Sequence, residues 1–256
     1  MSPNILFYDI ETSLMKAWLF QLGDQAIRHH QLVEGYNRQK VICIAYCFNN
    51  GPVKIIDWGY EKQNDARVIM EFDKIIKQAD IIIGKNSDKF DNKTLNFVRM
   101  VTGQPGMPTW VKSTDDLEKQ MRKYFRMPSY SLDYISQVLG LGGKKKMEFS
   151  DWVEIGTKAP GTGIKAFKKM LSYCAKDVRD TRSIWNYCKH HFEPKFNVST
   201  FLDEPACKHC HGTDVVKNGT RLAGLTRWQE YFCRRCGMYA GRTPMKSKLK
   251  SNEKLR

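Results

Sequence analysis

A short apolar segment near the N-terminus, which ends in two carboxylates, restricts the fold more than any other part of the sequence. Residues 4–8 can form one buried strand, and Asp9 and Glu11 follow directly. Along an extended chain, side chains two residues apart point in the same direction, so these carboxylates face the same side. Mg²⁺ and Mn²⁺ favour carboxylate oxygens. The segment therefore predicts either a solvated strand end or half of a divalent metal site.

The pattern of the following segments predicts a mixed sheet that is covered on both faces. A hairpin at the start, and then alternating helices and strands, favours this arrangement. Strands are predicted over 41–48, 53–58, 80–84 and 109–112, and helices over 65–79, 92–101, 131–139 and, as one or two helices, 164–192. Ser113 or Thr114 is expected to cap a further helix, and the Gly- and Lys-rich residues 140–163 are expected to be exposed.

Further carboxylates follow in two places. Asp91 lies after the apolar strand 80–84, at the predicted start of a helix, where it either caps the helix or supplies a ligand. Tyr173 and Asp177 are four residues apart, which places a phenol and a carboxylate on one helix face. Taken alone, this second pair also fits a surface Asp and a half-buried Tyr.

In their order and spacing, these motifs resemble those of the DEDD exonuclease superfamily. The motifs are Phe-Tyr-Asp-Ile-Glu-Thr at 7–12, Asn-x-x-x-Phe-Asp at 86–91 and Tyr-x-x-x-Asp at 173–177. They are most similar to the tyrosine subtype found in the proofreading domains of family B DNA polymerases. Residues 130–133, followed by Leu139-Gly140 and the lysines 144–146, strengthen the resemblance, which extends roughly from residue 4 to residue 191.

The resemblance implies a ribonuclease H-like fold, a mixed five-stranded sheet flanked by helices, and a two-metal 3′→5′ exonuclease that releases 5′-mononucleotides. Two Mg²⁺ or Mn²⁺ ions would be held by four carboxylates, and Tyr173 would orient the attacking water. The histidine subtype would need His where Ser172 stands. Asp88 and Asp180 are nearby competitors that do not fit the motifs. The implied ligands are Asp9, Glu11, Asp91 and Asp177, and the implied nucleic-acid contacts in this domain are Asn86 and Phe90.

Two Cys-x-x-Cys motifs near the C-terminus predict a structural zinc site. Cys207 and Cys210 are separated by 22 residues from Cys233 and Cys236, and two such pairs supply four thiolates for a tetrahedral Zn²⁺. Four cysteines close the site, although His209 and His211 are alternative ligands. The segment is similar to zinc ribbons of nucleic-acid proteins such as transposases, and residues 217–219 are expected to form its hairpin turn. The other four cysteines, 43, 47, 174 and 188, have no ligand spacing.

Basic and aromatic residues alternate in the same region, which suits phosphates and stacked bases, or else the rim and core of a small ribbon. These candidates are Arg221, Arg227, Trp228, Arg234 and Arg235. We expect an exonuclease domain at 1–196, a linker at 197–205, a zinc ribbon at 206–243 and a basic tail at 244–256.

The formal net charge of +15 over 256 residues favours a polyanionic partner. No apolar run reaches the ~20 residues that span a bilayer, and no secretion signal is recognisable. We therefore expect no membrane partner and a reducing compartment such as the cytoplasm, where cysteines bind metals more often than they form disulfides.

The favoured function is exonucleolytic digestion of DNA, most readily single-stranded DNA. Three alternatives remain at this point: an exoribonuclease, a structure-selective endonuclease with the same metals, and a nucleic-acid-binding protein without catalysis. No polymerase palm pattern follows in the sequence, so we expect the chain to act alone or with a separate polymerase or replication or repair protein.

Overall fold

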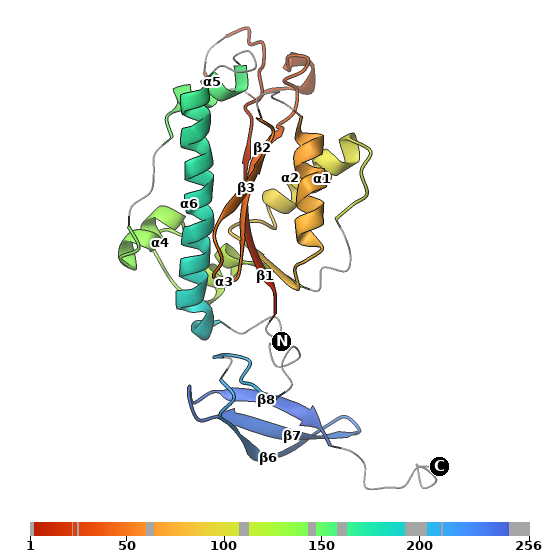
Figure 1. Cartoon of the computed structure of the whole chain (residues 1–256), viewed down its shortest axis with the longest axis vertical. Helices are drawn as coiled ribbons and strands as arrows, with labels where there is room; N and C mark the ends of the chain where they lie inside the picture. Colours follow the sequence, from red (N-terminus) through yellow and green to blue (C-terminus); the bar gives the residue numbers. More distant parts are fainter. Residues whose placement is uncertain are drawn as a thin grey trace. The chain divides into compact units, whose positions relative to one another are not determined.

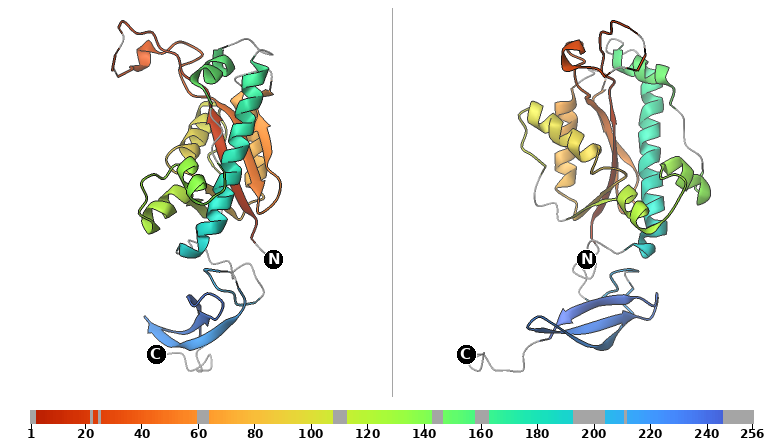
Figure 2. Two further views of the ribbon diagram at one scale, coloured as in Figure 1. Left: turned by 90° about the vertical axis from the view of Figure 1, so that its left-hand side faces the viewer. Right: turned by 180° about the vertical axis from the view of Figure 1, so that it is seen from behind.

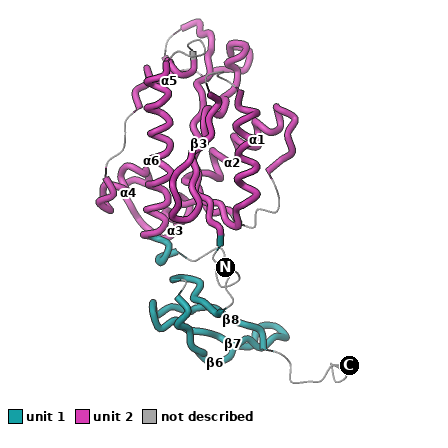
Figure 3. Tube along the Cα trace, in the orientation of Figure 1, with its two compact units in different colours: residues 1–3, 188–256 teal, residues 4–187 magenta. Residues whose placement is uncertain are grey.

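A computed structural model describes residues 3–21, 23–24, 26–59, 64–107, 113–142, 147–157, 163–192, 204–210 and 212–245. The chain divides into two compact units, residues 4–187 and residues 188–256 together with 1–3 (Figure 3). The lysines 144–146, His211, most of the expected linker and most of the expected basic tail lie outside the described residues.

The larger unit is built on a five-stranded mixed sheet in the order β3-β2-β1-β4-β5. The central strand β1 pairs antiparallel with β2 and parallel with β4; β2 pairs antiparallel with β3, and β4 parallel with β5. This is a ribonuclease H-like arrangement, and the predicted α/β fold class is confirmed. The strands are β1 (Ile5–Thr12), β2 (Val41–Phe48), β3 (Lys54–Asp57), β4 (Ile81–Gly84) and β5 (Ser113–Asp116).

Helices cover both faces of this sheet. Figures 1 and 2 show α6 on one side and α1 and α2 on the other. The central strand is buried between them because its apolar residues alternate between the two faces. Phe7 packs edge-on against Trp185 of α6, with ring centroids 5.7 Å apart, whereas Tyr8 contacts Phe72 of α1 at 5.4 Å. The helices are α1 (Asp65–Ile76), α2 (Asp91–Val101), α3 (Leu117–Tyr124), α4 (Leu132–Val138), α5 (Phe149–Thr157) and α6 (Ile164–Cys188).

Three local predictions are wrong or incomplete. The last strand of the sheet is 113–116, and residues 109–112 lie outside the described part of the chain. Ser113 and Thr114 pair with β4 and so cannot cap a helix; the cap of α3 is Asp116, whose carboxylate accepts from the amides of Glu118 and Lys119. The segment 140–163 contains α5, in which Ile155 is buried.

The smaller unit is a three-stranded antiparallel sheet in the order β6-β7-β8. The expected hairpin turn at 217–219 instead lies inside β6, where the pairing register shifts and Gly219 takes φ +77°. The chain turns at residues 224–225, where Gly224 also has a left-handed backbone. The strands are β6 (Val215–Ala223), β7 (Thr226–Cys233) and β8 (Tyr239–Pro244). None of the described helices is long and apolar enough to span a bilayer.

Candidate active site

Strand β1 carries Asp9 and Glu11 to the face of the sheet that α6 covers. Because side chains alternate along a strand, both carboxylates point to the same side as Phe7, which contacts α6. Cys174 of α6 lies next to Asp9, with 3.7 Å between its Sγ and Asp9 Oδ2. One ligand atom from each of Asp9, Glu11 and Cys174 lies within 4.8 Å of the others. This group is compact enough to hold one metal ion.

Asp91 reaches the same region from the other side of the sheet. It begins α2 and is 3% exposed, and its Oδ1 accepts a hydrogen bond from the amide of Ile10 at 3.2 Å. The N-cap position belongs to Phe90, which forms no side-chain cap. The capping alternative for Asp91 is therefore wrong, and its carboxylate is directed at β1.

The loop before Asp91 is held in place by a buried carboxylate. Asp116 is 1% exposed and accepts hydrogen bonds from the amides of Asn86 (2.9 Å) and Asp88 (3.2 Å). Asn86 has a left-handed backbone with φ 60°, and a Cβ on Gly84 would lie 2.5 Å from the Cβ of Ser87. Glycine is therefore required where the chain leaves β4 for this tight loop.

Tyr173 and Asp177 lie on the face of α6 that is directed at β1. Asp177 is 7% exposed, and the Tyr173 side chain hydrogen-bonds to it. The competing carboxylates are held elsewhere: Asp180 forms a salt bridge with Lys176 at 2.5 Å, and Asp88 forms one with Lys119 at 2.7 Å. Each competitor is paired with a lysine, which offsets its charge.

The four candidate carboxylates repel one another. The pKa of Asp9 is raised well above its usual value, first by burial and then by the charges of Asp91, Glu11 and Asp177. Burial raises the pKa of Asp91 to about 7, and Asp116 adds to the rise, although hydrogen bonds from backbone amides and the charge of Lys85 oppose it. Divalent cations relieve such crowding of negative charge, so the donor set fits hard metal ions.

Two cysteines that the sequence analysis left without a role, Cys43 and Cys174, lie beside the carboxylates. Cys174 hydrogen-bonds with Cys43. The pKa of the Cys174 thiol is raised well above its usual value, mainly by burial and also by this contact and the nearby carboxylates. Cys43 stands opposite Glu11 in the pairing of β1 with β2. The only feature of the sequence that could have placed Cys174 at the site is its position next to Tyr173. The distance in sequence between Cys43 and Cys174 does not indicate that they are in contact.

The second candidate metal centre is in the smaller unit. The sulfur atoms of the four cysteines lie within 4.8 Å of one another, with Cys207 and Cys236 3.6 Å apart and Cys210 and Cys233 also 3.6 Å apart. Disulfide sulfurs are ~2.05 Å apart. A tetrahedral ion with Zn–S bonds of ~2.3 Å requires sulfurs roughly 3.8 Å apart, so the observed set fits zinc.

The ribbon's basic residues lie mostly at its surface. Arg221 pairs in register with Trp228, and the guanidinium of Arg242 lies 4.5 Å from the ring centroid of Trp228. The half-buried Trp228 is thus covered by an arginine that the sequence analysis did not single out. Among the predicted nucleic-acid contacts, the exposed side chains are Arg221, Arg227, Arg234, Arg235 and, beside Asp91 in the larger unit, Phe90.

Replacing Asp91 with asparagine should stabilise the metal-free protein. A carboxyl group whose pKa rises from 3.8 to about 7 on folding costs stability once it ionises, at most about 4 kcal/mol. The native state binds the proton more tightly, so wild-type stability falls as the pH rises from 4 to 7. Asparagine keeps the acceptor for Ile10 without the charge. Thermal unfolding in EDTA should show a gain for Asp91→Asn that is small at pH 5 and large at pH 8.

The matched control for this experiment is Asp88→Asn, three residues earlier, which removes a lysine-paired carboxylate. Its effect should be small at both pH values. Added Mg²⁺ should stabilise the wild type more than Asp91→Asn. If Asp91→Asn raised the melting temperature equally at pH 5 and pH 8, Asp91 would not be a buried carboxylate whose ionisation destabilises the fold.

Comparison with known proteins supports the fold. Neither the protein-family models nor the curated protein sequences match this chain. Among solved structures, the family B DNA polymerase from the hyperthermophilic archaeon Pyrobaculum calidifontis matches with a TM-score of 0.57 and 18% identity. The match covers 74% of this chain and 25% of the polymerase, so this chain spans about a quarter of that protein. The likeness shows a shared fold.

Proposed function

We propose that the protein is a metal-dependent 3′→5′ exonuclease of the tyrosine DEDD subtype, which acts on single-stranded DNA and releases 5′-mononucleotides. One observation carries the proposal: three separate elements bring four carboxylates and a tyrosine together, and the charges of three carboxylates raise the pKa of the fourth, Asp9. A binding module has no need for such mutual repulsion. The likeness in fold to a polymerase supports the choice of nucleic acid as substrate.

Asp9, Glu11, Asp91 and Asp177 would hold two Mg²⁺ or Mn²⁺ ions. When bound, such ions neutralise phosphate charge and make water a better nucleophile. Asp9 and Glu11 project from a rigid central strand, and the amide of Ile10 orients Asp91, so the ligands are positioned before substrate arrives. Without cations, the same carboxylates would repel the substrate phosphate.

Tyr173 acts as a hydrogen-bond donor. Burial raises the pKa of its phenol above the ordinary value, and the charges of Asp177 and Glu11 raise it further. The phenol therefore stays protonated at neutral pH and cannot serve as a general base. Its role is to hold and orient the attacking water next to the scissile phosphate.

The ribbon would take one structural Zn²⁺ and help to hold nucleic acid through its exposed arginines. Four cysteines close the coordination shell, so this ion would not be catalytic. Phosphate contacts from arginines are electrostatic and independent of base sequence. A separate polymerase or a replication or repair protein is the partner class that fits a proofreading nuclease.

Digestion of 5′-labelled oligonucleotides tests this function. Single-stranded DNA and RNA are incubated with Mg²⁺ or Mn²⁺, with EDTA as the negative control. We expect a ladder that shortens from the 3′ end of DNA and is absent with EDTA. Preferential digestion of RNA would identify an exoribonuclease, and a single internal cut would identify an endonuclease. Salt-sensitive binding without cleavage would identify a binding protein. Each of these results would overturn the proposal.

Tyr173→Phe tests the tyrosine subtype in the same assay. Loss of the hydroxyl should lower kcat by about 10- to 100-fold, because residues that orient a metal site's reactants contribute on this scale. Tyr187→Phe is the matched control, since Tyr187 lies on the same helix and is 61% exposed. Equal rates for the wild type and Tyr173→Phe would exclude the assigned role.

A further inference from the structure

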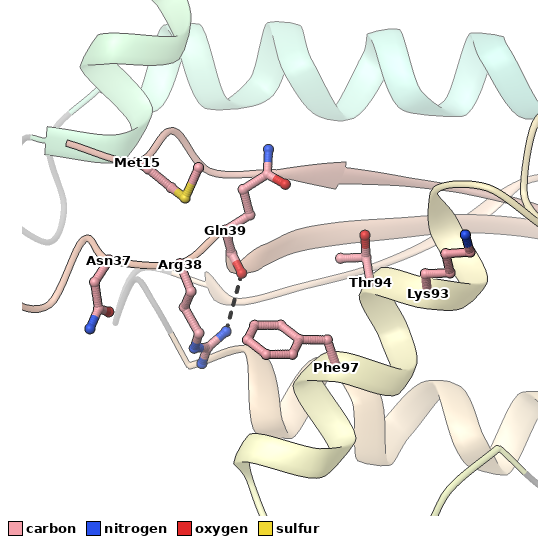
Figure 4. A pocket seen from close by; sticks show the side chains of 7 residues that line it. All are labelled: Met15, Asn37, Arg38, Gln39, Lys93, Thr94 and Phe97. Atoms are coloured by element: carbon pink, nitrogen blue, oxygen red, sulfur yellow. Dashed lines mark hydrogen bonds between the residues drawn. The ribbon is translucent and has the colours of Figure 1, made fainter. Parts of the chain in front are cut away.

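A pocket of about 380 Å³ lies between α2 and the segment that follows β1. Figure 4 shows Met15 and Gln39 from that segment near Phe97, Thr94 and Lys93 from α2. Its volume is in the range of small-molecule sites. Its lining combines apolar, amide, hydroxyl and cationic groups, which is the combination that a nucleotide needs.

The two walls of the pocket are formed by chain segments that also carry candidate carboxylates. Met15 is four residues beyond Glu11 and Lys93 is two residues beyond Asp91, so each wall continues an element that carries a carboxylate. The two ends of the segment 13–40 are tied together, because the Ser13 amide donates to the carbonyl of Lys40 at 2.8 Å. Figures 1 and 2 place this segment at the same end of the sheet as α5.

The chemistry of the lining separates into two parts. Met15 and Phe97 are apolar but 49% and 43% exposed, so they offer two surfaces against which a flat base can stack. Asn37 and Gln39 are exposed amides, which can donate to and accept from a base edge. Lys93 is exposed and forms no salt bridge with another described residue, so its charge is available for a phosphate.

The floor of the pocket is held in place by hydrogen bonds within the protein. The guanidinium of Arg38 forms two hydrogen bonds with the carboxylate of Asp65, at 2.6 and 2.9 Å, and donates to the carbonyl of Gln39 at 3.2 Å. Asp65 is 2% exposed and also accepts from the amide of Val41. Arg38 is therefore a fixed structural residue, and the backbone that presents Asn37 and Gln39 is held before any ligand binds.

From these observations we infer that the pocket binds one nucleotide of the substrate strand next to the nucleotide being cleaved. The base stacks on Phe97 and Met15, its edge faces Asn37 and Gln39, and its phosphate is paired with Lys93. This inference rests on the proposed nuclease function and adds to it a binding subsite outside the carboxylate motifs.

The first measurement is binding of fluorescein-labelled oligo(dT) to the full-length protein in EDTA, where cleavage cannot occur. Phe97→Ala and Lys93→Gln should each raise Kd by about tenfold, the scale of one stacked base or one phosphate contact. In a plot of log Kd against the logarithm of salt concentration, the slope should decrease by about one for Lys93→Gln and stay unchanged for Phe97→Ala. The controls are Met100→Ala, exposed on the same helix, and Lys74→Gln, exposed on α1, with melting temperatures verifying folding.

The second measurement is photocrosslinking with 5-iododeoxyuridine placed at successive positions from the 3′ end. A crosslink at one position to a peptide containing Met15 or Phe97 is the expected result. Wild-type cleavage in Mg²⁺ is assayed in parallel, so the two ideas fail separately. If the wild type cleaves DNA, but both variants have the wild-type Kd and the crosslinks fall elsewhere, the subsite alone is overturned. If the wild type does not cleave DNA, the proposed nuclease function is overturned.

Discussion

Asp9→Asn should reduce cleavage of single-stranded DNA by at least about 10³-fold, while the protein remains folded and binds the oligonucleotide. Asp9 lies at the centre of the site, close enough to Asp91, Glu11 and Asp177 for each charge to raise its pKa. Asparagine has the same shape but is a much poorer ligand for a hard cation. The measurement is single-turnover digestion in saturating Mg²⁺, together with oligonucleotide binding in EDTA.

The matched control is Asp180→Asn, on the same helix as the proposed ligand Asp177. Asp180 is bound to Lys176, so its loss should leave the rate within a few-fold of the wild type. Binding in EDTA should be equal or tighter for Asp9→Asn, because one charge that repels phosphate has gone. A fully active Asp9→Asn, or an inactive Asp180→Asn, would show that the metal ligands are a different set.

Removal of zinc should unfold the ribbon and leave the larger unit intact. The buried core of the ribbon is Cys207, Cys233 and Ala240, packed against Val215 and Tyr231 and the other two cysteines, so the ligands themselves are most of the core. Structural zinc sites contribute about 10–16 kcal/mol to folding, more than so small an apolar core can replace. Cys233→Ser should therefore lose zinc and ribbon structure together.

Metal analysis by mass spectrometry and limited proteolysis measure this outcome. The wild type should contain one zinc per chain, and Cys233→Ser should contain none and be cleaved rapidly within 206–243. Affinity for DNA should fall and become less sensitive to salt, while residual digestion of short oligonucleotides continues. Cys188→Ser, a buried cysteine outside the cluster, should keep its zinc. A protease-resistant ribbon without zinc would refute the structural role.

The sequence alone was sufficient for the features that depend on local pattern. The apolar run 4–8 predicted a buried strand, and the two-residue spacing of Asp9 and Glu11 predicted that both carboxylates point to the same side. Phe7 and Tyr8 pack on opposite faces of the sheet, which is the alternation on which this prediction depends. Paired Cys-x-x-Cys motifs predicted a cluster because two tight turns present four sulfurs at fixed spacing. The order of hairpin, helix and strand was enough for the mixed sheet. The roles of the site residues remain predictions.

The tertiary structure decided which residues meet. Asp91 contacts β1 across 81 positions of sequence, and Asp88, only three residues earlier, is paired with Lys119 instead. The motif resemblance favoured Asp91 over Asp88, but the different contacts of the two carboxylates depend on the loop that Asp116 holds. In the same way, Cys174 lies at the site because α6 packs against the sheet near β1, and the pocket beside α2 exists because the segment 13–40 packs near that helix. Local spacing determines the direction of a side chain, but its neighbours depend on the register and packing of distant elements.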